Sequence, residues 1–86
     1  MLAQSNTGEL RLTVTDPSGL AVKTGVELVS EANQYRYTLI TDERGYVDFE
    51  RLPYGIYQVW IEPPGFAKVS QPVEIRSAHP WIGRFG

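Results

Sequence analysis

The sequence predicts an all-β fold, an antiparallel Greek-key-type β-sandwich of about seven short strands. Two observations predict it. Apolar and polar residues alternate in short segments, and turn signals of Gly, Pro, Asp and Asn separate those segments at intervals of about 8–12 residues. No window keeps a helical period, because Gly or Pro interrupts every segment that is long enough. The 86 residues are enough for one domain.

The first half of the chain predicts strands at 10–15, 26–29 and 35–41. Leucine and valine occupy every second position of the first strand, which is typical of a half-buried strand. It stops at DPSG (16–19), a type I turn signature. The second strand (VELV) follows a glycine, and the third (YRYTLIT) is rich in aromatic and β-branched residues that suit a pleated surface. DERG (42–45) then turns the chain, with a glycine that takes a positive φ at low cost.

The second half predicts four more strands. In 46–49 the valine and phenylalanine point inward, and LPYG (52–55) is expected to be a loop whose leucine lies under the sandwich. In 56–61, IYQVWI, the tyrosine, valine and last isoleucine continue the inward face. Pro-Pro-Gly ends that strand, since proline cannot donate to a ladder. Two further short strands are expected at 66–69 and 73–76.

Composition excludes several classes of function. The eight Lys and Arg residues are scattered singly and the formal net charge is −2, so the electrostatic footprint of a nucleic-acid binder is missing. No apolar stretch approaches the roughly 20 residues that span a bilayer. The absence of cysteine excludes disulfides, a thiolate zinc site and a cysteine nucleophile. An apolar content of 42% favours a folded domain.

Five motifs in order resemble the carboxypeptidase regulatory-like domain, a transthyretin-like β-sandwich related to the CnaB-type domains. The resemblance covers about residues 8 to 76. Its motifs are L-x-V-x-D-x-S-G (12–19), G-V-x-L (25–28), T-D-x-x-G-x-V-x-F (41–49), L-P-x-G-x-Y-x-V (52–59) and P-G-F (64–66). Every residue that this pattern requires serves folding, so the resemblance indicates the fold much more than the function.

The resemblance implies a non-catalytic accessory module of a larger exported protein, in the periplasm, outer membrane or cell surface. Its partners would be other domains of that protein. The family also occurs at the N-terminus of TonB-dependent outer-membrane receptors. Leu2-Ala3-Gln4 is similar to the end of a secretory signal cleaved after Ala3, which favours that setting. The alternative is a flexible N-terminal tail at 1–7, followed by the sandwich at 8–76.

No residue pattern predicts catalysis, a cofactor or a metal. His79 is the single histidine, and its nearest carboxylate, Glu74, is alone on a strand. Asp42, Glu43 and Asp48 are the acidic residues that raise the question of calcium, which requires six to eight oxygen ligands. Asp42 is better explained as a residue that caps its own turn. The serines and threonines have no base to activate them, and we expect no enzyme activity.

The CnaB-type domains, to which this chain is also similar, form an internal Lys–Asn isopeptide bond with a catalytic Glu. Residues 62–66, EPPGF, resemble their E-x-x-P-x-G-Y segment. The first strand offers no lysine, however, and no asparagine follows Asn33, so we expect no isopeptide bond here.

Exposed aromatic residues are the one feature beyond folding. Alternation places Trp60 on the outer face with Ile56 beside it, and Tyr46 and Tyr54 are candidates for the same surface. Apolar patches and tryptophan mark interfaces, which makes a neighbouring domain the first candidate partner of this surface. The alternative partner is a glycan, since aromatic platforms stack on sugar rings.

The C-terminal residues 77–86 are expected to be a tail or an incomplete last strand that ends before the usual boundary of the family. Pro80 removes a ladder donor and Gly83 weakens a strand. We therefore expect at most a short, poorly paired strand, and weak self-association along this edge, with Trp81 and Phe85 filling an exposed groove.

Overall fold

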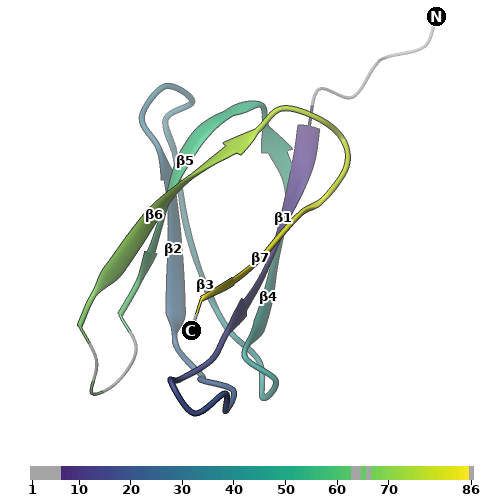
Figure 1. The fold of residues 1–86 in the computed structure, drawn as a ribbon. Coiled ribbons are helices and arrows are strands. Elements are labelled where there is room, and N and C mark those ends of the chain that lie inside the picture. Colours follow the sequence, from purple (N-terminus) through teal and green to yellow (C-terminus); the bar gives the residue numbers. More distant parts are fainter. Residues whose placement is uncertain (1–6, 63–64, 66, 86) are drawn as a thin grey trace, which may run out of the picture.

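The computed structural model describes residues 7–62, 65 and 67–85, and they form an all-β sandwich (Figure 1). Of the N-terminal tail predicted at 1–7, residues 1–6 lie outside the described residues, and Thr7 begins the first strand. Most of the Pro-Pro-Gly-Phe segment and Gly86 also lie outside them. No helix long and apolar enough to cross a membrane occurs in the described part. The seven strands are β1 (Thr7–Val14), β2 (Gly25–Ser30), β3 (Tyr35–Ile40), β4 (Tyr46–Pro53), β5 (Gly55–Ile61), β6 (Val69–Ile75) and β7 (Trp81–Phe85).

The strands divide into two facing sheets. One sheet has three strands in the order β4-β1-β7, and the other has four in the order β3-β2-β5-β6. Four of the five strand pairings are antiparallel. The exception is β7, which leaves β6, crosses to the other sheet and runs parallel to β1 (Figure 1).

Alternation along each strand builds the core, as the sequence predicts. Every second residue of β1, β2 and β5 is buried, so one face of each sheet packs on the other. Tyr57 is fully buried, and its ring meets that of Tyr35 edge-on at 5.6 Å between centroids. The buried hydrophobic residues are Leu10, Leu12, Val14, Val26, Leu28, Val47, Phe49, Leu52, Tyr57, Val59, Ile61, Val73 and Ile75.

The prediction of a loop at LPYG (52–55) is wrong, because β4 continues through Pro53 with a bulge and β5 begins at Gly55. The pairing of β1 with β4 shifts register between Gly8 and Leu10, so Glu50 and Arg51 together oppose a single β1 residue. Arg51 has a φ of 57°. The extra residue returns Leu52 to the inner face, where it is fully buried as expected, but within β4 instead of a loop.

The end of the chain differs from prediction in two ways. A single strand, β6, replaces the two expected at 66–69 and 73–76, with Phe66 outside the described residues. Pro72 lies within it, and β6 tolerates a proline because it is an edge strand. β7 is short but pairs with β1 along all its five residues, so the expectation of a poorly paired tail is wrong. Trp81 and Phe85 pack against the core.

Both predicted aspartate turns form. The Oδ1 atom of Asp16 accepts hydrogen bonds from the backbone N–H of Ser18 and of Leu20, at 2.9 and 3.0 Å. The Oδ1 atom of Asp42 does the same for Arg44 and Tyr46, at 2.8 and 3.0 Å. These backbone hydrogen bonds, first that from Tyr46, lower the pKa of Asp42. The Asp42 carboxylate is therefore engaged in its own turn.

Candidate functional site

A row of side chains crosses the outer face of the four-stranded sheet. Glu27 of β2 pairs with Thr38 of β3 on one side and with Trp60 of β5 on the other, and Trp60 pairs with Ser70 of β6. The residues before and after Glu27 and Trp60 in their strands face the core, so the row itself points outward. The fold thus gathers four side chains from four strands on one surface.

A groove lies at this row. It has a volume of about 260 Å³ and is lined by Gly25, Glu27, Thr38, Trp60, Glu62 and Lys68. The Lys68 ammonium lies 4.9 Å from the centroid of the Trp60 ring. Such a cation–π contact contributes about 0.5–1 kcal/mol at an exposed site, so a ligand that stacks on the ring can displace it. One aromatic ring, two carboxylates, one ammonium and one hydroxyl converge here.

The structure brings together only part of the surface predicted from the sequence. Ile56 lies on the same outer face of β5 as Trp60 and is 63% exposed, with Gln58 between them. Tyr54 joins β4 to β5, and its carbonyl accepts a hydrogen bond of 3.1 Å from the Asn33 side chain. Tyr46 belongs to β4, on the outer face of the opposite sheet. Tyr46 and Trp60 therefore do not share a surface.

A carboxylate cluster that sequence reasoning missed lies on that opposite sheet. Glu9 of β1 and Asp48 and Glu50 of β4 have carboxylate oxygens within 4.8 Å of one another. The Arg11 side chain donates a hydrogen bond to Glu9 at 3.0 Å, which lowers the pKa of Glu9. The β4 bulge places Glu50 opposite Glu9. No local pattern in the sequence indicates this bulge. Glu43, an exposed residue of the 42–45 turn, is not part of this cluster.

The pKa of Asp48 is raised to about 6, first by desolvation and then by Glu9 and Glu50. Its Oδ1 atom is buried and has no hydrogen-bond partner among the described residues. Because the folded state holds the proton more tightly than the unfolded chain, this carboxyl favours folding at low pH. That contribution is lost as the pH rises from about 4 through about 6.

Asp48→Asn is therefore expected to raise the stability above pH 6 and to leave it unchanged near pH 4. The amide keeps the shape of the carboxyl without the charge that Glu9 and Glu50 oppose. Urea midpoints of both proteins between pH 4 and pH 8 measure the effect. A variant less stable than the parent at pH 8 would contradict the assignment.

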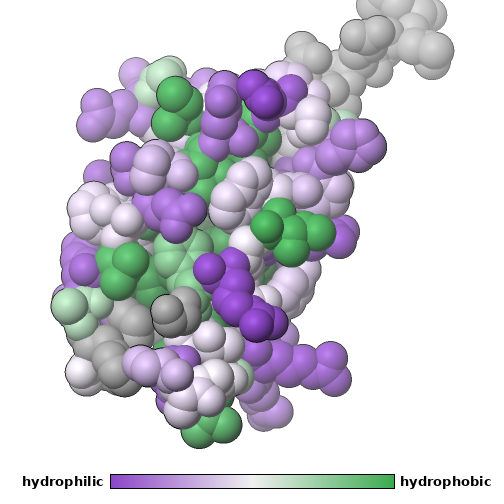
Figure 2. Space-filling view, viewed as in Figure 1, coloured by the Kyte–Doolittle hydropathy of each residue, from purple (hydrophilic) through white to green (hydrophobic). Residues whose placement is uncertain are grey.

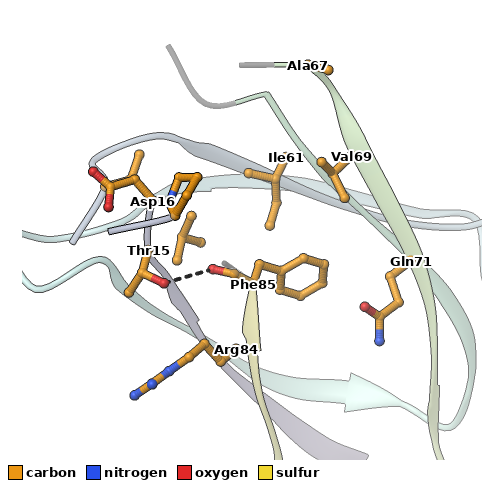
Figure 3. Close-up of a pocket in the computed structure, with 11 residues that line it drawn as sticks. Thr15, Asp16, Ile61, Ala67, Val69, Gln71, Arg84 and Phe85 are labelled. Carbon is orange, nitrogen blue, oxygen red and sulfur yellow. Dashed lines mark hydrogen bonds between the residues drawn. The ribbon is translucent and has the colours of Figure 1, made fainter. Parts of the chain in front are cut away.

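A second, larger groove lies between the two edge strands β6 and β7. Its volume is about 490 Å³. The Phe85 ring points into it, with Ile61 and Val69 above and Gln71 opposite, whereas the Arg84 side chain points away (Figure 3). Figure 2 shows apolar surface in the middle of this side of the molecule, between polar residues. Its lining is mainly apolar, and its polar side chains are those of Thr15, Asp16, Gln71 and Arg84.

The lysines and the asparagine among the described residues all lie on the surface, outside the core. Lys23 and Lys68 are both exposed, and Asn33 is exposed and holds the β4–β5 connection. His79 is exposed on the connection from β6 to β7. The intact mass of the purified protein is expected to equal the mass of its sequence. A deficit of one ammonia, or of one water, by mass spectrometry would show that a side-chain cross-link had formed.

No protein family and no curated protein matches the chain, but several solved structures share its fold. It is 19% identical to the Bacillus anthracis TIE protein, with a TM-score of 0.81 over 93% of this chain and 16% of that one. It is 20% identical to BcpA, the major pilin subunit of Bacillus cereus, here a D312A variant, with a TM-score of 0.69 over 93% of this chain and 29% of that one.

A third structure is similar over nearly its whole length. A candidate carbohydrate-binding protein from Pseudomonas aeruginosa is 17% identical, with a TM-score of 0.68 over 96% of this chain and 90% of that one. The chain thus spans less than a third of the TIE protein and of BcpA. At these identities the likeness shows the fold: this chain is a β-sandwich of the kind found in those pilin and binding proteins.

Proposed function

We propose that the chain is a non-catalytic accessory module of a larger exported protein. The observation that carries the proposal is the similarity of this domain, over 93% of its length, to small parts of two much longer proteins, one of them a pilin subunit. His79 is exposed, and the Asp42 carboxylate is engaged in its own turn.

Within this class, we propose the N-terminal extension of a TonB-dependent outer-membrane receptor as the specific setting, on the resemblance of the sequence motifs. Sequencing the gene on both sides of this region tests both the accessory-module proposal and the specific receptor setting. A signal segment upstream and further domains downstream are expected, with a receptor domain among them in the specific case. An uninterrupted cytoplasmic enzyme around the module would contradict the proposal.

Carbohydrate binding through the Trp60 groove is the second candidate function. The observation that favours it is the composition of the groove, in which an aromatic ring is surrounded by hydrogen-bonding groups. A large continuous apolar patch would favour contact with a neighbouring domain instead. Here Gln58 separates Ile56 from Trp60, and charged Glu27 and Lys68 flank the ring. Similarity to the candidate carbohydrate-binding protein from Pseudomonas aeruginosa supports the same choice.

Tryptophan fluorescence with a panel of neutral oligosaccharides tests this function. In a Trp81→Phe background, Trp60 is the only indole of the chain. Stacking should shift its emission. Tyr46→Ala, which removes an exposed aromatic ring from the opposite sheet, is the matched control and should leave the shift intact. An unchanged spectrum at millimolar sugar would remove the glycan candidate and leave the accessory module.

Weak self-association along the C-terminal edge is a further proposal. β7 is an edge strand, and Phe85 lines the apolar groove beside it. Light scattering after size exclusion, over a wide range of concentration, should show a rising average mass. A constant monomer mass would contradict this proposal.

A further inference from the structure

We infer that the Trp60 groove selects uncharged oligosaccharides of about three units that lie across the strands. This inference rests on the proposed glycan function and deepens it. It concerns the length, the direction and the charge of the ligand.

The strand register sets the direction and the length. Thr38, Glu27, Trp60 and Ser70 are successive cross-strand neighbours, one from each strand of the sheet. Adjacent strands lie about 4.8 Å apart, so the row spans about 14 Å. One sugar ring stacked on Trp60 cannot reach both ends of such a row. A short linear oligosaccharide can, with the Thr38 hydroxyl group in the groove at one end and the Ser70 hydroxyl group, on the row just outside the groove lining, at the other.

The depth of the groove depends on a missing side chain. Gly25 lines it at an outward position of β2, and a Cβ added there would meet only the Thr38 methyl group, at 3.8 Å. That is an ordinary van der Waals separation. A larger residue at this position would therefore fill the space beside Trp60 without disturbing the core.

The charges of the groove select against acidic sugars. Glu27 and Glu62 contribute two carboxylates and Lys68 one ammonium, so the lining carries a net negative charge. Arg36 forms an ion pair with Glu27 at 3.9 Å from outside the groove lining, and because its side chain is largely exposed, this pair is weak. Carboxylates accept hydrogen bonds from sugar hydroxyl groups, but they repel the carboxylate of a uronic acid, and such like-charge contacts produce specificity.

Calorimetric titration with glucose oligomers of increasing length, and with oligogalacturonate as the acidic probe, tests the inference. Affinity should rise up to about three units, the length of the row, and then level off. Oligogalacturonate at low salt should bind at least about tenfold more weakly than the neutral oligomer of the same length. Acidic oligomers that bind as tightly as neutral ones would overturn the selection by charge.

Gly25→Val provides the structural arm of the test. It should abolish binding while the melting temperature stays equal or rises, because valine favours a strand and a Cβ at this outward position makes only an ordinary van der Waals contact. Ile56→Ala, on the same face of β5 but outside the groove, should bind as the parent does. Binding that Trp60→Ala abolishes but Gly25→Val retains would preserve the glycan function and contradict the cross-strand groove. If no sugar of either class binds, both proposals fail.

Discussion

Gly45→Ala is expected to destabilise the domain by about 3 kcal/mol or more, from backbone strain and from steric overlap together. Gly45 has a φ of 74°, and a Cβ atom built on it would overlap the carbonyl oxygen of Val14. The Val14 oxygen is a backbone atom and cannot rotate away as a side chain would, so the overlap is relieved only if the end of β1 moves. That movement would break the 2.7 Å hydrogen bond from the Val14 N–H to the Gly45 carbonyl.

Gly19→Ala is the matched control. Gly19 also has a positive φ, 91°, but a Cβ added there meets nothing within 4 Å. It should therefore show the strain alone, about 1–2 kcal/mol. Chemical denaturation of both variants measures the difference, which is the steric cost at Gly45. Equal losses of stability in the two variants would show that overlap with Val14 adds no steric cost at Gly45.

Tyr57→Ala is expected to cost about 3–5 kcal/mol, the usual range for removing a large buried aromatic side chain. A chain of this length has a total stability of only about 4–13 kcal/mol. Tyr57 is fully buried, and its ring contacts Tyr35. Its hydroxyl donates to the carbonyl of Pro53 at the end of β4. The variant should be largely unfolded or marginally stable by circular dichroism and thermal denaturation.

Tyr57→Phe separates the two contributions. It keeps the ring and removes only the hydroxyl group, so a loss of about 1–2 kcal/mol is expected from the Pro53 carbonyl left without this donor. A Phe variant as unstable as the Ala variant would mean that the hydrogen bond, and not the ring, carries the stability.

Alternation and turn residues predicted the layers of this fold but not their connections. The inward faces of β1, β2 and β5 follow from period two, and the Asp16 and Asp42 turns follow from local side-chain hydrogen bonds. The β4 bulge was missed, because a φ of 57° at Arg51 is set by pairing with β1 and not by its own sequence. The parallel pairing of β7 with β1 is equally non-local.

The candidate site was predictable only in its central residue. The outward position of Trp60 follows from alternation in β5. Glu27 and Thr38 lie beside it only through the register of three strands, which is fixed by long-range pairing. Tyr46 has the same local pattern as Trp60, but alternation does not tell which sheet receives a strand, and β4 joins β1.

The proposed binding surface of this module is the outer face of the four-stranded sheet at Trp60, with a glycan as its ligand. Titration of the isotopically labelled protein with a neutral glucose trimer, followed through the backbone amide signals in NMR, tests it most directly. The account predicts saturable shifts at Thr38, Glu27, Trp60 and Ser70, which lie on four adjacent strands. Saturable shifts confined to the groove at Phe85, or no shifts at all, would contradict it.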